Sequence, residues 1–204
     1  MRASRPASDR PALSRDQVVD AAVELLRRDG IESLSLRRVA GDLGVTAMAL
    51  YRHVEDVNDL VVAILDRGFS VFRDRLRAAA PADDPRQAVV STAAAFWDFS
   101  TDHGTYFELM FLTRRLPGGL DDRRAVERIT AESFDILVER VEAARKAGAI
   151  RSGHPRETAG ELLALAVGTV ALHRTGNLGW PDDRARERFL RRIRAALDRV
   201  DPAP

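Results

Sequence analysis

The residues whose types and spacing are most informative lie in one short segment of the chain. Gly44 can adopt the tight backbone of a turn. Ala40 precedes it by four residues and Leu50 follows it by six, the spacing that lets two helices cross closely around a turn. Side chains on the outer face of the second helix would then be available to the major groove. Those side chains are Ala47, Met48, Ala49, Tyr51, Arg52 and His53.

The first supporting helix is predicted near the start of the chain. Ser14 and Gln17 have the spacing of a capping box, and the helix should end at Gly30. Apolar residues recur along it at intervals of three and four, so that one face can cover a small core. They are Val18, Ala21, Ala22, Leu25 and Leu26.

Two short helices and a long one should follow. Ser35 is expected to cap the second helix and Thr46 the third, which should cover residues 47–53. Two short amphipathic helices around a glycine also occur in proteins that bind no DNA. A fourth helix over about residues 56–79 would be about 35 Å long at 1.5 Å per residue.

The rest of the chain is predicted to be helical as well, which indicates an all-α fold of about nine helices. The break around Pro81–Pro85 is the clearest in the chain, and Asp84 should cap the helix that follows. The later helices are expected over residues 85–103, 105–115, 122–147, 155–174 and 182–200. The expected organisation is a flexible basic tail (1–12), a helix-turn-helix domain (13–60) and a helical ligand-binding and dimerisation domain (61–204), with the fourth helix joining the last two.

The stretch from about Leu13 to Asp66 resembles the DNA-binding domain of the TetR (tetracycline repressor) family. The third helix of that family ends in an aromatic-x-His-aliphatic or aromatic signature, here Tyr51-Arg52-His53-Val54. The resemblance implies that Tyr51 and His53 contact phosphates. The whole set of DNA contacts expected is Ser35, Arg37, Thr46, Ala47, Met48, Ala49, Tyr51, Arg52 and His53.

Within that set, Arg37 and Arg52 are the better candidates for a guanine, and Met48 and Ala49 for thymine methyl groups. The sequence departs from the family at the start of the fourth helix, where Val57 replaces a lysine that often grips phosphate in relatives. Binding should therefore depend more on Arg52 and on the arginines of the tail.

A cluster of aromatic residues marks a candidate ligand site. Residues 96–111 hold six of the eight aromatic residues between Pro81 and Pro181. Aromatic residues in helical bundles usually pack in the core, yet beside the small residues 93–95 they could line a cavity. The candidate ligand contacts are Phe96, Trp97, Phe99, Tyr106, Phe107, Met110, Phe111, Phe134 and His173.

The run from His103 to Phe111 also resembles one TetR C-terminal subgroup. That subgroup often carries a histidine in its penultimate helix, where this chain has Ala166-Val167-Gly168. The polar contact made by that histidine is therefore lost or moved to His173, and a largely apolar effector is expected.

Small and apolar stripes on the last two helices are predicted to form a dimer interface, although about half of these residues could pack internally. The stripes are Ala164, Leu165, Gly168, Ala171 and Leu172, then Phe189, Ile193, Ala196, Leu197 and Val200. The family resemblance implies a four-helix bundle formed by two subunits. A two-fold dimer would double the contacts on a palindromic operator.

The expected function is that of a ligand-responsive transcriptional repressor, which binds double-stranded DNA as a homodimer and is released by a small apolar effector. One alternative is an enzyme using Asp102, His103 and Glu108, although the sequence shows no nucleophile motif and no glycine-rich phosphate loop. Another is a helical interaction module that binds no DNA.

Composition argues against a metal site, a cofactor and a membrane-spanning segment. The chain of 204 residues has no cysteine, and its four histidines lack ligand-like spacing, so no metal and no cofactor are expected. No run of about 18 apolar residues could span a membrane, and no apolar stretch follows the N-terminal arginines, so a cytoplasmic location is expected. A net charge of +1 does not exclude DNA binding, because basic residues can gather on one face.

Overall fold

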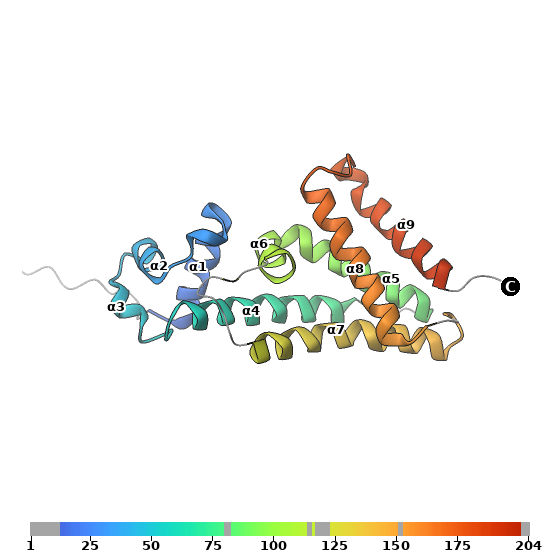
Figure 1. Cartoon of the computed structure of the whole chain (residues 1–204), viewed down its shortest axis with the longest axis horizontal. Coiled ribbons are helices and arrows are strands. Elements are labelled where there is room, and N and C mark those ends of the chain that lie inside the picture. The colour runs from blue at the N-terminus through green and yellow to red at the C-terminus, as the bar shows by residue number, and fades with distance from the viewer. Residues whose placement is uncertain (1–12, 80–82, 114–115, 117–122, 151–152, 201–204) are drawn as a thin grey trace, which may run out of the picture.

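The computed structural model of the protein is an elongated assembly of helices (Figure 1). It describes residues 13–79, 83–113, 116, 123–150 and 153–200, and these form nine α-helices and no strand, which confirms the all-α class. The helices are α1 (Arg15–Asp29), α2 (Leu36–Leu43), α3 (Ala47–Leu50), α4 (Val57–Ala78), α5 (Pro85–Asp102), α6 (Gly104–Phe107), α7 (Arg123–Lys146), α8 (Pro155–Arg174) and α9 (Asp182–Val200). Two further turns are η1 (Ile31–Ser33), a 3₁₀ turn, and η2 (Glu108–Leu112), a π-helical turn. The predicted basic tail, residues 1–12, lies outside the described residues.

Capping residues fix the limits of the first two helices where the sequence predicts them. The Gln17 N–H donates to Ser14 Oγ (3.2 Å) and the Ser14 N–H donates to Gln17 Oε1 (2.9 Å), completing the capping box of α1. Gly30 is the C-cap that follows α1, and Ser35 is the N-cap that precedes α2, where its Oγ accepts a hydrogen bond from the Arg38 N–H. Gly44 ends α2 with a φ of 67°, a left-handed conformation that favours glycine.

The structure differs from the predicted helices at two places. Thr46 precedes α3 with extended backbone, but its side chain makes no capping hydrogen bond, and α3 ends at Leu50 rather than His53. The helix expected over residues 105–115 is present over residues 104–112, but it is not a regular α-helix, since the short α6 is followed by the π-helical turn η2. The wider turn places Phe111 against α4, with its ring centroid 5.7 Å from that of Phe72.

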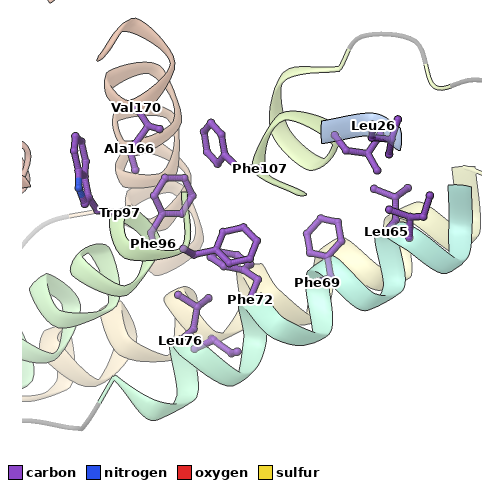
Figure 2. Packing of buried hydrophobic residues seen from close by; sticks show 14 of the residues in the cluster. Leu26, Leu65, Phe69, Phe72, Leu76, Phe96, Trp97, Phe107, Ala166 and Val170 are labelled. Carbon is purple, nitrogen blue, oxygen red and sulfur yellow. The ribbon is translucent and has the colours of Figure 1, made fainter. Parts of the chain in front are cut away.

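Helix α4 is the axis of the molecule, running beside α7 and contacting α1, α5 and α6 (Figure 1). Its buried side chains belong to one continuous hydrophobic core. Figure 2 shows Leu65 close to Leu26 of α1, with Phe69 and Phe72 further along the same helix towards α5. Because the core is continuous, α4 belongs both to the N-terminal region (α1–α3) and to the C-terminal body (α5–α9).

The stripe predicted for dimerisation on α9 requires correction. Phe189, Ile193 and Leu197 are completely or almost completely buried within the protomer, where α9 packs on α5 and α8. These three side chains are core residues and are not available to a partner. On α8, by contrast, Gly168 and Leu172 are exposed.

Candidate functional site

The surface around α3 combines a buried anchor with exposed apolar side chains. Leu50 is completely buried, and Val54 packs beside it in the core. Met48 and Tyr51 are 72% and 53% exposed, and they are two of the four large hydrophobic side chains that are exposed in the described part of the chain. Met48 on α3 and Tyr51 directly after it therefore give the protein an outward apolar contact surface.

Two arginines beside this surface carry charge that the described residues do not neutralise. Arg37 on α2 and Arg52 after α3 are exposed, and neither forms an ion pair within the described ranges. The neighbouring Arg38, in contrast, pairs with Asp29, and Arg28 pairs with Asp29 as well. Arg37 and Arg52 are therefore exposed guanidinium groups of the kind that can bond a phosphate or a guanine.

The other predicted DNA contacts occupy the same end of the molecule, where α2 and α3 lie (Figure 1). Ala47, Ala49 and His53 are half-buried, and Thr46 is exposed. The Ser35 hydroxyl already accepts a hydrogen bond from the Arg38 N–H, so it serves the cap of α2.

Arg15 holds the reading turn, residues 51–53 after α3, and its role was not predicted from the sequence. Its guanidinium donates to the His53 carbonyl oxygen (2.5 Å) and to both carboxylate oxygens of Asp59 (2.5 and 3.1 Å). These bonds lower the pKa of Asp59 below its ordinary value, although partial burial opposes the shift. Arg15 thus ties α1, the turn after α3 and the first turn of α4 together.

A cavity of about 610 Å³ lies between α4, α5, α7 and α8 and is closed on one side by η2. Four of the predicted ligand contacts line it: Phe96, Met110, Phe111 and Phe134. Phe69 and Phe72 of α4 complete the aromatic wall (Figure 2). Small residues such as Ala93 also line the cavity. Its volume is within the range of cavities that hold small molecules.

The other five predicted ligand contacts do not line this cavity. Phe99 and Phe107 are completely buried in packed core. Trp97 stacks on His173, with ring centroids 5.3 Å apart, and His173 Nε2 lies 3.5 Å from Asp182 Oδ1. Tyr106 packs against α4 at Gly68, where an added Cβ would lie 2.8 Å from the tyrosine ring.

A buried serine in the cavity wall is a second feature that sequence reasoning missed. Ser133 of α7 is 3% exposed, and its hydroxyl has no hydrogen-bond partner among the residues that the structure describes. Its only sequence signal is its place in the helical repeat, since it falls on the same stripe as Ile136 and Leu137. At the rim, Arg156 donates to Asp135 (2.9 Å) and lies over the ring of Phe134.

The residues of the enzymatic alternative do not form a shared site. Asp102 pairs with Arg75 (2.7 Å) and Glu108 pairs with Arg174, so each carboxylate is bound to a different arginine. His103 is half-buried, and that burial lowers its pKa. Over the described ranges, no cluster of three or more potential ligand side chains could hold a metal ion. No described helix is both long and apolar enough to span a membrane.

The all-helical fold, with a short exposed helix after a glycine turn, defines the class as helix-turn-helix transcriptional regulators rather than enzymes. Residues 18–64 match the family model for bacterial regulatory proteins of the tetR family. Residues 89–197 match the model for the tetracyclin repressor-like C-terminal domain. The chain belongs to the TetR family.

Similar proteins carry related names. The HTH-type transcriptional repressor DrrR1 of Streptomyces coeruleorubidus is 47% identical over 58 residues, which cover 28% of this chain and 22% of that protein. An uncharacterised HTH-type transcriptional regulator of Mycobacterium tuberculosis is 34% identical over 118 residues, covering 55% of this chain and 51% of that protein. The chain thus spans about half or less of the length of these two relatives.

Solved structures extend the likeness over nearly the whole chain. A Rhodococcus protein of unknown function has a TM-score of 0.74 at 26% identity and covers 97% of each chain. The regulator FadR of Bacillus subtilis, solved with stearoyl-CoA, has a TM-score of 0.72 at 15% identity and covers 91% of this chain and 96% of its own. The second likeness shows the fold alone.

Proposed function

We propose that the protein is a cytoplasmic, homodimeric repressor that binds a palindromic operator and is released from it by a small, largely apolar effector. The observation that carries the proposal is that α4 contacts the N-terminal helix α1 and also lines the cavity. Leu65 of α4 packs near α1, and Phe69 and Phe72 of the same helix line the cavity (Figure 2). A ligand that prefers one position of α4 would shift the population of DNA-binding dimers.

Contacts between α6, α4 and α1 support this coupling. Met110 and Phe111 of η2 line the cavity, and Tyr106, just before them, packs on Gly68 of α4. The preceding residue of α4, Arg67, donates to Asp16 of α1 (2.6 Å) and pairs with Asp20 as well. A shift of η2 would therefore be transmitted through α4 to α1, whose Arg15 holds the reading turn.

The outer face of α8 supports dimerisation. Leu172 is 46% exposed, Ala164 and Gly168 are exposed beside it, and no atom lies within 4 Å of a Cβ added at Gly168. Small residues would allow a second copy to approach closely. Ala164→Arg should convert the dimer to monomers in sedimentation experiments, whereas Ala143→Arg, at an exposed site on α7, should leave the dimer intact. A native chain that sediments as a monomer would contradict this part of the proposal.

DNA binding is tested with the full chain and sequences selected from a random oligonucleotide pool. Arg52→Ala should weaken binding to the selected sequence about tenfold to a hundredfold, because it removes an unpaired cation from the reading surface. Arg77→Ala, at the exposed far end of α4, is the matched control and should bind normally. If the native chain selects no sequence and binds no duplex at low salt, the protein is not this kind of repressor.

A further inference from the structure

We infer that the effector is an uncharged apolar molecule carrying one hydroxyl or carbonyl group, which forms a hydrogen bond with Ser133. This inference rests on the proposal that the cavity holds the effector. It adds the chemical class of that molecule and the side chain that recognises it.

The Ser133 hydroxyl is the polar atom of the cavity that still needs a partner. It is buried, and it makes no hydrogen bond with any described residue. Thr92, buried to the same degree in the same cavity, differs because its Oγ1 donates to the Ala88 carbonyl oxygen (2.9 Å). A buried polar group without a partner is unfavourable, so a ligand group that bonds Ser133 gains more than the same group at Thr92.

Water is a poor substitute for such a ligand group. A buried water needs two to four polar partners, whereas the cavity wall is mostly phenylalanine, leucine and alanine. A serine hydroxyl can either donate or accept, so a ligand carbonyl and a ligand hydroxyl both satisfy it. A poorly held water is readily displaced by a ligand that makes this bond and fills the apolar space.

The charges at the rim favour a neutral molecule. Arg156 and Glu127 both line the cavity, both are exposed, and their charges are opposite. Arg156 is already paired with Asp135. A carboxylate inside the cavity would therefore lose its hydration without gaining an unpaired cation among the described lining residues.

The experiment compares three probes of one skeleton, namely biphenyl, hydroxybiphenyl and biphenylcarboxylate, in competition with the neutral dye Nile red on the full-length protein. Hydroxybiphenyl should bind about three- to tenfold more tightly than biphenyl, the gain from one net hydrogen bond. Biphenylcarboxylate should bind most weakly. In Ser133→Ala the advantage of hydroxybiphenyl over biphenyl should disappear, while the affinity for biphenyl itself stays the same.

Two further variants make the test specific. Thr92→Val removes a cavity hydroxyl that the helix already satisfies, and it should keep the full preference for hydroxybiphenyl. Ser133→Cys retains the size of the side chain with a weaker donor, and it should lose most of the preference. This variant decides the matter should Ser133→Ala fail to fold.

The outcomes separate this inference from the proposed function. If neither Nile red nor any biphenyl binds, the cavity takes no ligand and the effector part of the proposed function fails. If Nile red and biphenyl bind but the hydroxyl gives no advantage, the inference is overturned while the effector cavity stands. An advantage that survives Ser133→Ala, or a carboxylate that binds most tightly, overturns it equally.

Discussion

The buried residues of the N-terminal helices α1–α3 are packed closely, whereas those of the body, α4–α9, surround a cavity. Around α1–α3 the buried side chains described are aliphatic throughout, and capping bonds and ion pairs hold the helix ends. In the body, phenylalanines from α4, α5, α7 and η2 surround a cavity of about 610 Å³. A surface that must match DNA needs one fixed geometry, whereas a ligand-responsive region needs space that the protein itself leaves unfilled.

The largest expected effect tests the rigid region. Leu50→Ala should lower the free energy of unfolding by about 2–5 kcal/mol, because it leaves a cavity in a closely packed core. It should also weaken DNA binding, since Leu50 anchors α3. Met48→Ala, two residues earlier and on the exposed face, should change stability by about 0.5 kcal/mol at most. Urea unfolding measures both, and similar losses for the two variants would contradict the assigned packing.

The next effect contrasts the two regions directly. Ala40→Leu places a larger side chain where α2 packs in the core and should destabilise the protein by about 1–3 kcal/mol. Ala93→Leu makes the same change at a residue that lines the cavity, where the larger side chain can fill empty space. It should instead stabilise the protein by about 0.5–2 kcal/mol. The measurement is again urea unfolding at one temperature. Equal destabilisation at both positions would mean that the body has no usable space.

The smallest effect concerns the brace at the reading turn. Because the folded pKa of Asp59 is depressed, the Arg15–Asp59 pair stabilises the protein above the unfolded aspartate pKa of about 3.9. This contribution is lost as the pH falls through the lower folded pKa. Arg15→Met should therefore be about 0.2–1 kcal/mol less stable than the native chain at pH ~7, and this difference should shrink as the pH falls through the folded pKa of Asp59. The part that remains at lower pH belongs to the bond with the His53 carbonyl oxygen, which does not titrate.

A double-mutant cycle checks that result. In an Asp59→Asn background, Arg15→Met should have no pH-dependent effect over the same range. A pH-dependent difference that persists without the carboxylate would assign it to another group.

Local signals predicted the limits of most helices because capping acts between residues a few positions apart. Pro155 and Asp182 mark the starts of α8 and α9 as expected, and Ser14 and Gly30 bound α1. The π-helical turn η2 was not predicted, because its apolar residues 109–112 are consecutive and therefore fit any helical period equally well.

Tertiary packing decided what the sequence left open. Phe96 and Phe99 are three residues apart on α5, yet Phe96 lines the cavity and Phe99 is enclosed in packed core. The apolar stripe of α9 has the same period whether it faces the protomer's own core or a second subunit. Arg15 reaches Asp59 across 44 positions of sequence, a contact that no local pattern encodes.

Because α4 is long, a small tilt of the helix at the cavity produces a large displacement at its other end. Its 22 residues span about 33 Å, so a tilt of about 5° around the end near the cavity carries the opposite end sideways by about 3 Å. That displacement is close to the rise between neighbouring base pairs, about 3.4 Å. In the proposed dimer, a tilt of both α4 helices would change the distance between the two α3 helices. They would then no longer fit the spacing of the operator half-sites, although no helix would have to unfold.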